Sequence, residues 1–287
     1  MRTTILVTLA VIAMHGAVAQ QLVTYKSSDA AGQPIEVAAM LTLPATPLPA
    51  GTRGPAVVLF HSGWGWETPV TAQYAKALSA AGFTVLEPRI FPNDKAPAPR
   101  PFSVTQIAYD ALGLLAGRDD VDPRRVGIAG FSWGGQLALH TAAAWAQAAH
   151  APRPDLKFAA HAPFYPVCWA FTAFAQGKRK TPGLPDDAFT KWTGAPVRIF
   201  AGGKDDYDDK DPAACAEFVS ALPAEYRSTF SVRVYPEATH GWDQDSARFY
   251  VNAACKGRGC WNINQSNAEV TRQGIRELVE FFRQEMP

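Results

Sequence analysis

The sequence predicts an α/β fold built on a mostly parallel central sheet, with helices on both faces and an antiparallel pair of strands at the N-terminal edge. From residue 56 onward, short apolar runs alternate with segments of helical periodicity, which is the pattern of parallel strands joined by crossover helices. The apolar runs are continuous, so their strands are expected to be buried on both faces. Two earlier strand candidates are joined by a short polar turn and therefore pair antiparallel.

Composition and charge place the chain among folded proteins. It has 287 residues, of which 47% are hydrophobic, and 27 Lys and Arg residues stand against 26 Asp and Glu. A disordered chain would combine low hydrophobicity with high net charge, and this chain has neither. A formal charge of +1 also means that the chain lacks the excess of basic residues typical of nucleic-acid-binding proteins. We therefore expect a protein that can bury a sizeable core and has no nucleic-acid partner.

The N-terminal segment has the pattern of a secretory signal peptide. Arg2 is its only charged residue, and residues 5–14 are apolar apart from Thr8. This apolar stretch is about as long as a signal-peptide core and too short to span a bilayer. The small residues at 17–19 match the requirement of signal peptidase, so we expect cleavage after Ala19.

Cleavage there would leave one domain over residues 20–287, located in the periplasm or secreted, without membrane contact. A signal that stays attached as a membrane anchor is the alternative. Export also means an oxidising compartment, in which cysteines tend to pair.

The 4 cysteines allow three pairings. Cys255 and Cys260 enclose a short Lys-Gly-Arg-Gly spacer that can close a small ring. Cys168 follows one strand candidate and Cys215 lies beyond the next, so adjacent parallel strands can bring these two together. We favour these two pairs, and no C-x₂-C motif or paired histidine supports a zinc site.

The strand candidates are bounded by turn residues. The first two are separated by the polar turn at 27–29 and form the antiparallel edge, whereas the later ones are short apolar runs. The expected strands cover residues 22–25, 35–43, 56–60, 83–86, 126–129, 158–165, 197–201 and 230–235.

The helical segments repeat apolar residues at intervals of three and four. Val70, Tyr74 and Leu78 share one face of the first of them, and Gly82 is a plausible helix stop. The expected helices cover residues 68–81, 104–115, 136–149 and 268–286.

Three segments show neither pattern. Residues 44–55 form a connector rich in Pro and Gly, and residues 93–101 form a proline-containing loop. Residues 168–195 have no clear period and are expected to be an insertion over the carboxyl ends of the strands, where ligands bind in such folds.

The strongest chemical signal is the sequence Gly-Phe-Ser-Trp-Gly-Gly at 130–135, between an expected strand and an expected helix. A G-x-S-x-G turn strains its serine and needs small neighbours, because other backbone passes close by. The turn lifts the Ser132 hydroxyl above the sheet edge, where the helix N-terminus offers free amides to a developing negative charge. The pattern predicts Ser132 as a nucleophile, with a glycine-rich turn and a capping serine as the alternative.

A serine nucleophile needs a base, usually His, and the base needs a carboxylate to fix its tautomer. In this architecture the three follow the order Ser, acid, His. Of the 6 histidines, only His240 follows a strand and an acidic segment downstream of Ser132. Asp205 is predicted as the acid because it comes first after the Gly-Gly turn behind strand 197–201, and Asp206 is the runner-up.

The other acids of this loop are expected to form a solvated face or a weak cation site. They lack the regularly spaced oxygen ligands and the closing Glu of a calcium loop. We therefore assign no metal to the protein.

An oxyanion hole needs two backbone amides, one after the nucleophile and one from a loop that follows a neighbouring strand. Trp133 provides the first. Gly63 is predicted to provide the second, because glycine lets its amide turn inward, and Trp64 is the nearest competitor. His61 is expected to orient this loop, since the base is already assigned to His240.

Aromatic residues flank the predicted site loops. Trp64, Phe131 and Tyr207 are candidates to line a substrate pocket, which would suit an apolar or aromatic acyl or alcohol group. Ordinary packing beneath the loops is the alternative for each of them.

These motifs together resemble the dienelactone hydrolase family of the α/β-hydrolase fold. The resemblance covers roughly residues 35–285 and rests on the elbow at 130–135, the Gly-Gly-Lys-Asp turn at 202–205 and the segment Ala-Thr-His-Gly-Trp-Asp at 238–243. It implies hydrolysis of a small-molecule ester or lactone without metal or organic cofactor. It also implies that Ser132, Asp205 and His240 form the triad, with Gly63 and Trp133 as oxyanion amides.

The chain departs from the best-known members of that family, which carry a cysteine nucleophile and an acidic residue in the oxyanion loop. Here the nucleophile is Ser132, and the corresponding loop position is Ser62. The sequence therefore predicts an exported serine hydrolase that cleaves carboxylic esters or lactones through an acyl-enzyme. A serine peptidase or acyltransferase on the same fold, and a non-catalytic binding protein, are the alternatives.

Overall fold

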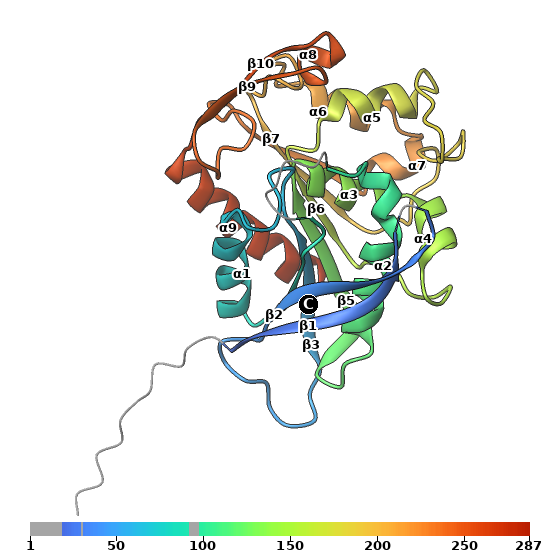
Figure 1. The fold of residues 1–287 in the computed structure, drawn as a ribbon, viewed down its shortest axis with the longest axis vertical. Helices are drawn as coiled ribbons and strands as arrows, with labels where there is room; N and C mark the ends of the chain where they lie inside the picture. The colour runs from blue at the N-terminus through green and yellow to red at the C-terminus, as the bar shows by residue number, and fades with distance from the viewer. Residues whose placement is uncertain (1–18, 30, 92–97) are drawn as a thin grey trace, which may run out of the picture.

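A sheet of eight strands lies at the centre of the molecule, in the spatial order β1-β2-β4-β3-β5-β6-β7-β8 (Figure 1). β1 pairs antiparallel with β2 and β2 with β4, while all other neighbours are parallel. The mostly parallel sheet with an antiparallel N-terminal edge is thereby confirmed. The strands are β1 (Gln20–Ser28), β2 (Pro34–Thr42), β3 (Gly54–Phe60), β4 (Thr84–Pro88), β5 (Val121–Phe131), β6 (His161–Phe164), β7 (Val197–Gly202) and β8 (Phe230–Tyr235).

The computed structural model describes residues 19–29, 31–91 and 98–287. Residues 1–18 of the expected signal peptide and residues 93–97 of the expected proline-containing loop lie outside these ranges. Within the described ranges, no helix is both long enough and apolar enough to cross a membrane.

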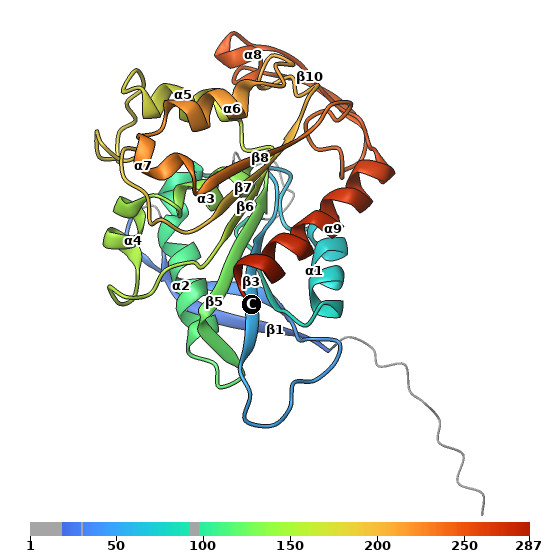
Figure 2. The same cartoon turned by 180° about the vertical axis from the view of Figure 1, so that it is seen from behind.

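Helices cover both faces of the sheet (Figures 1 and 2). α1 and α9 lie side by side on one face, and α2 and α3 lie on the other. The helices are α1 (Val70–Ala80), α2 (Thr105–Ala116) with a 3-10 turn before it (Pro101–Val104), α3 (Trp133–His140), α4 (Ala144–His150), α5 (Cys168–Ala175), α6 (Ala214–Ala221), α7 (Ala224–Arg227), α8 (Ala254–Gly257) and α9 (Ala268–Glu285).

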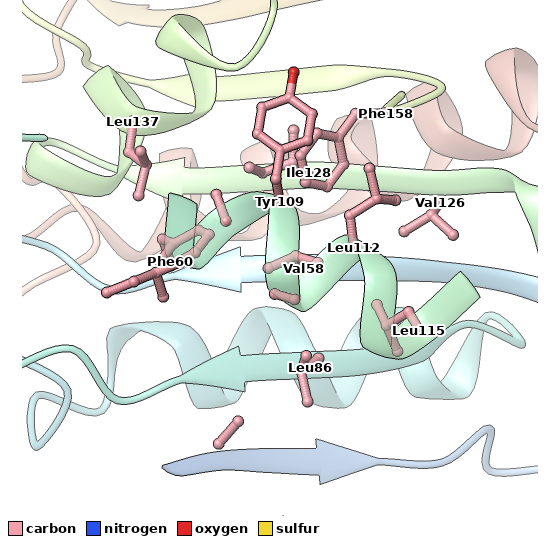
Figure 3. Close-up of a cluster of buried hydrophobic side chains, with 14 of the residues drawn as sticks. Val58, Phe60, Leu86, Tyr109, Leu112, Leu115, Val126, Ile128, Leu137 and Phe158 are labelled. Atoms are coloured by element: carbon pink, nitrogen blue, oxygen red, sulfur yellow. The ribbon is translucent and has the colours of Figure 1, made fainter. Parts of the chain in front are cut away.

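The core forms because successive side chains of a strand point to opposite faces. In β3, Val58 and Phe60 enter the cluster under α2 and α3 (Figure 3), whereas Val57 and Leu59 enter the cluster under α1 and α9. All four are fully buried. This explains why the strand is apolar throughout: both of its faces are covered.

The single helix expected over 136–149 is wrong, because the chain forms two helices there, α3 and α4. The backbone between them pairs with a distant segment instead of continuing the helix: Ala143 forms an isolated bridge with Trp192, and the Ala144 amide donates to Lys191 O. A tertiary contact overrides the helical propensity of this alanine-rich stretch.

Several further elements were not expected from the sequence, among them a helix and a hairpin of two strands. α5 lies within the aperiodic segment 168–195, and β9 (Ala247–Val251) pairs antiparallel with β10 (Cys260–Asn264) in a separate hairpin. In Figure 1, α5, α6 and this hairpin lie at the same end of the molecule, above the carboxyl ends of the parallel strands.

The disulfides pair Cys168 with Cys215 and Cys255 with Cys260, which is the pairing favoured from the sequence. The first bond joins the N-terminus of α5 to α6. The second closes the hairpin, since Cys255 lies in α8, between the two hairpin strands, and Cys260 begins β10. Each bond thus ties down part of the layer that covers the carboxyl ends of the strands.

A buried histidine on α3 gives the fold a measurable pH dependence. His140 is packed among Phe102, Phe171 and Phe189, and its Nδ1 has no hydrogen-bond partner among the described residues. Burial lowers the pKa of His140 to about 3. Because the unfolded chain takes up the proton first, acidification below about pH 6.5 favours unfolding by roughly 2 kcal/mol at pH 5.

The His140→Phe variant is therefore expected to lose less stability than the parent protein when the pH falls from 7 to 5. The difference should be about 2 kcal/mol in the free energy of unfolding, measured by urea denaturation at both pH values. Phenylalanine suits the aromatic surroundings and cannot titrate. Equal losses in the two proteins would contradict the assignment of this pH dependence to His140.

Candidate active site

Ser132 stands at a sharp turn between β5 and α3. Its φ of 50° lies in the left-handed region, which is costly for a residue with a side chain. The neighbouring glycines are required by space: a Cβ on Gly130 would lie 2.2 Å from Gly134 O, and one on Gly134 would lie 2.5 Å from His61 O. Ser132 itself is only half-buried.

The three residues predicted as a triad meet in one chain of hydrogen bonds. Ser132 Oγ lies 2.7 Å from His240 Nε2, and His240 Nδ1 lies 2.8 Å from Asp205 Oδ2. His240 follows β8 and Asp205 follows β7, so neighbouring parallel strands deliver both side chains to the same edge of the sheet. His240 and Asp205 are 3% and 2% exposed, so water barely competes for the contact between them.

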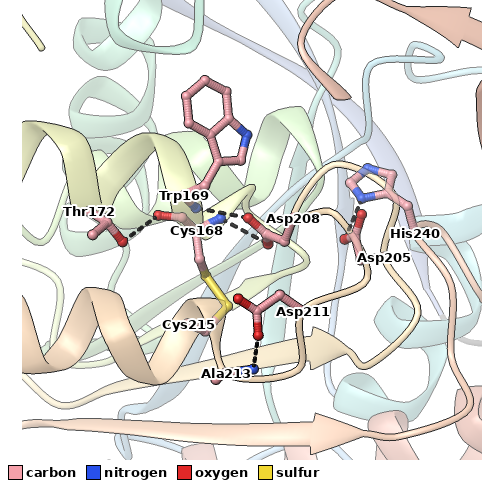
Figure 4. Close-up of a disulfide and its surroundings, with 9 residues drawn as sticks. All are labelled: Cys168, Trp169, Thr172, Asp205, Asp208, Asp211, Ala213, Cys215 and His240. Atoms are coloured by element: carbon pink, nitrogen blue, oxygen red, sulfur yellow. Dashed lines mark hydrogen bonds and ion pairs between the residues drawn. A yellow bond between two sulfur atoms is a disulfide. The ribbon is translucent and has the colours of Figure 1, made fainter. Parts of the chain in front are cut away.

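Asp205 and its neighbour Asp206 face different partners. One oxygen of the Asp205 carboxylate contacts His240 (Figure 4). The other accepts a hydrogen bond from the Tyr207 amide, which holds the carboxylate toward His240. Asp206 Oδ2 accepts instead from the amide of Ile263 in β10, at 2.8 Å, and Lys210 lies near its other oxygen. The structure thus brings Asp205 to His240, and it ties the runner-up Asp206 to the hairpin.

The expectation of a solvated acidic face is wrong for the buried residues Asp206 and Asp208. Asp208 accepts hydrogen bonds from the amides of Cys168 and Trp169 at the start of α5, where a negative charge suits the helix dipole (Figure 4). Burial, together with the nearby Asp205 carboxylate, raises the pKa of Asp208 to about 7.

Among the described residues, Cys168, Asp208 and Cys215 make the one group of three potential metal ligands. The two sulfur atoms are joined in a disulfide, so neither can act as a thiolate ligand. This donor set does not fit a zinc site.

Two tyrosine rings confine the imidazole of His240. The Tyr207 ring lies 4.2 Å from it and the Tyr165 ring 4.9 Å, measured between centroids, and the Tyr165 and imidazole rings form an edge-to-face pair. Burial raises the pKa of Tyr207 far above its ordinary value, so this phenol stays neutral. The packing restricts rotation of the imidazole and keeps Nε2 directed at Ser132.

The loop after β3 passes beside the serine turn. A Cβ on Gly63 would lie 3.8 Å from Trp133 Cβ, so the two residues predicted to supply oxyanion amides are neighbours. Neither amide donates a hydrogen bond to another described residue. The Trp64 amide, the competitor, donates to Ser62 Oγ at 3.3 Å.

His61 is built into the base of this loop. Its Nδ1 lies 2.8 Å from Ser62 O, its Nε2 accepts from the Ile90 amide, and its ring stacks on Trp133 at 5.5 Å. Burial lowers the pKa of His61 to about 4, so the ring is neutral at physiological pH. The contacts match the orienting role expected for it and leave both of its nitrogens occupied.

The three pocket candidates have different surroundings. Trp64 is 40% exposed beside Phe249 of the hairpin, and Tyr207 lies against His240. Phe131 does not line the site. It is fully buried against Tyr74, because the side chain preceding Ser132 on the strand points down into the core.

Several polar residues near the site were not singled out from the sequence. Asp243 and Gln244 follow His240 closely in the chain, and both hydrogen-bond to Tyr165. Their position close to His240 in the sequence could have drawn attention to them. Only the three-dimensional structure shows that their side chains point into the protein.

Comparison with known families and curated proteins shows which proteins this chain resembles. The model of the dienelactone hydrolase family matches residues 37–286. A protein of Salmonella typhimurium strain LT2 is 27% identical over 195 residues, which cover 63% of this chain. A protein of Escherichia coli K12 is 26% identical over 223 residues, covering 73% of this chain and 69% of its own. Both bear the provisional name carboxymethylenebutenolidase. The match covers 65% of the length of the Salmonella protein.

Solved structures share the fold. Thermogutta terrifontis esterase 2 phosphoramylated by tabun matches with a TM-score of 0.65 at 17% identity, covering 92% of this chain and 94% of that one. Est1E from Butyrivibrio proteoclasticus matches with a TM-score of 0.55 at 17% identity, covering 90% and 98%. The neighbours have the α/β-hydrolase fold expected here. With a family match over most of its length, this chain belongs to the dienelactone hydrolase family.

Proposed function

We propose that this protein is an exported serine hydrolase that cleaves carboxylic esters or lactones through a covalent acyl-enzyme. The family match and the esterases among the structural neighbours support hydrolysis of an ester or lactone. The observation that carries the serine mechanism is the chain of hydrogen bonds from Ser132 through His240 to Asp205. A protein that only binds ligands has no use for this arrangement.

In the proposed mechanism, His240 acts as the base. Because Asp205 accepts a hydrogen bond at Nδ1, the neutral imidazole keeps its proton there and presents a free lone pair at Nε2. Ser132 Oγ attacks the carbonyl carbon of the substrate while its proton passes to Nε2. The imidazolium then gives this proton to the departing alkoxide, leaving an ester bond between Ser132 and the acyl group.

Water completes the cycle by the reverse sequence of proton transfers. His240 takes a proton from water, the hydroxide attacks the acyl carbon, and the proton returns to Ser132 Oγ as the acid leaves. In both halves the carbonyl oxygen becomes negative, and the amides of Gly63 and Trp133 are proposed to stabilise it. Their lack of described hydrogen-bond partners and their position beside Ser132 support this role.

The surroundings of the site favour a substrate with an apolar or aromatic group near the reacting carbonyl. Trp64 and Tyr207 flank the proposed oxyanion loop and the base, respectively. Aromatic rings at such positions offer apolar area with little loss of conformational freedom.

Export is supported by two disulfides and by the signal pattern at the N-terminus. Disulfides persist in the periplasm and outside the cell, whereas the cytosol reduces them. The signal peptide is proposed to be removed after Ala19, and the exported domain acts on a small-molecule substrate.

Labelling with a fluorophosphonate probe tests the serine mechanism. The purified protein should be modified once, at Ser132, as located by peptide mass analysis, and the Ser132→Ala variant should remain unlabelled. A panel of p-nitrophenyl esters, lactones and peptide amides then defines the reaction, with turnover expected for esters or lactones. Absence of labelling would contradict the mechanism, and turnover of amides alone would favour a peptidase.

A further inference from the structure

A buried polar network lies directly beneath the proposed site. The carboxylate of Asp243 accepts hydrogen bonds from Tyr165 at 2.5 Å and from Tyr74 at 2.7 Å. Both tyrosines are at most 1% exposed. Burial raises the pKa of Asp243 to about 6, although the two hydroxyls lower it. A network that places a carboxylate in the interior is costly unless all its members are satisfied.

The network continues from Tyr165 to the loop that carries Gly63. Gln244 Nε2 donates to Tyr165 Oη at 3.1 Å, and Gln244 Oε1 accepts from Ser62 Oγ at 3.3 Å. Ser62 and Gln244 are 0% and 7% exposed. This series of hydrogen bonds runs from Asp243 through Tyr165 and Gln244 to Ser62. The hydroxyls of Tyr165 and Ser62 each accept one hydrogen bond and donate another, so the direction of every bond is fixed. Ser62 precedes Gly63, so the series ends on the proposed oxyanion loop.

Tyr165 also has a second contact with the site. Its ring packs against that of His240 in an edge-to-face pair, at 4.9 Å between centroids. Its φ of 37° is in the left-handed region, which a side-chain-bearing residue adopts only when its surroundings enforce it. One strained residue therefore touches the proposed base through its ring, and through its hydroxyl it connects to the proposed oxyanion loop.

We propose that Tyr165 and Gln244 are positioning residues, which hold the His240 imidazole and the Ser62–Gly63 loop at a fixed position relative to each other. This inference rests on the proposed serine mechanism. An oxyanion amide acts only if it already points at the developing charge, and a small displacement removes much of its effect. The link through Gln244 fixes that direction from the same tyrosine that confines the base.

Three variants test this role: Tyr165→Phe, Gln244→Leu and the double variant. Tyr165→Phe keeps the ring on His240 and removes only the hydroxyl. Each single variant is expected to lower kcat for a p-nitrophenyl ester roughly 10- to 100-fold with KM changed less than about twofold. Because both residues act through one series of bonds, the double variant should be no slower than the slower single variant.

Tyr74→Phe is the matched control. It removes a hydroxyl from the same carboxylate, at a similarly buried tyrosine, but Tyr74 contacts neither Gln244 nor Ser62 in the hydrogen-bond series. Its melting temperature should fall about as far as that of Tyr165→Phe, while its kcat stays within about threefold of the parent value. If the network only stabilises the fold, Tyr74→Phe and Tyr165→Phe should instead have the same kcat.

The outcomes separate this inference from the proposed function. If the parent protein is labelled at Ser132 but Tyr165→Phe and Gln244→Leu react as fast as it does, the positioning role is wrong and the serine mechanism stands. If the parent protein is neither labelled nor active on esters, both proposals fail. A selective loss of kcat and of the labelling rate in these two variants, with Tyr74→Phe spared, supports the positioning role.

Discussion

Ser132→Ala is expected to lower kcat for a p-nitrophenyl ester roughly 10⁴- to 10⁶-fold, because no other group can form the acyl bond. Alanine keeps the Cβ atom, so the strain at φ 50° and the close packing of the turn are unchanged. Thermal unfolding should therefore occur at nearly the parent temperature. Steady-state kinetics together with calorimetry separate loss of chemistry from loss of fold.

A variant that retained more than a tenth of the parent activity would rule out Ser132 as the nucleophile. Contaminating host esterases are the main source of false activity, and the same preparation treated with a fluorophosphonate reveals them. The Ser220→Ala variant, which removes an exposed hydroxyl on α6, is a suitable control and should behave as the parent protein.

Asp205→Asn is expected to lower kcat by about 10⁴-fold, the second large effect. An asparagine amide can donate to Nδ1, which would move the imidazole proton to Nε2 and leave no lone pair for Ser132. The contact between Asp205 and His240 is nearly dry, so water cannot replace the missing carboxylate. The decrease should appear in kcat, with little change in KM for a small ester.

Asp206→Asn provides the matched comparison, since it makes the same change one residue further along the chain. Asp206 binds the amide of Ile263 and does not contact His240, so this variant should lose stability in the hairpin region while kcat changes less than about tenfold. Hydrogen exchange of the β9–β10 hairpin measures the first effect. A larger loss of kcat in Asp206→Asn than in Asp205→Asn would reverse the assignment of the acid.

The central sheet and the serine turn could be predicted because local patterns determine both. Strands such as β3 lie between two layers of helices, and this requires a continuous apolar run that is visible in the sequence. The serine turn requires glycine at fixed offsets, as the clash between a Gly130 Cβ and Gly134 O illustrates. The order of the strands then brought Asp205 and His240 to the same edge of the sheet.

Features that depend on distant contacts could not be predicted in this way. The helix expected over 136–149 breaks because Ala143 pairs with Trp192, and nothing in the alanine-rich sequence indicates it. Phe131 was assigned to the pocket because it adjoins Ser132 in sequence, but alternation along the strand turns it to the core.

The β9–β10 hairpin was missed for a related reason. Its inward face includes the fully buried Asn262, while Tyr250 and Trp261 are more than half exposed. This inverts the usual alternation of apolar and polar residues, so periodicity gives no signal. The acids that anchor the hairpin and α5 likewise seemed solvated, because their partners are backbone amides from remote segments.

The anchoring of α5 by Asp208 and of the hairpin by Asp206 has a consequence for redesign. α5 and the hairpin are hydrogen-bonded to the loop that also carries Asp205, so they cannot be exchanged as independent modules. A chimera that takes α5 and the hairpin from a relative must also take the acidic loop that binds them in that relative. Otherwise the loop will shift and disturb the contact of Asp205 with His240. Libraries aimed at new substrates should instead vary exposed side chains such as Trp64 and Tyr250, because such changes leave the hydrogen bonds of Asp206 and Asp208 intact.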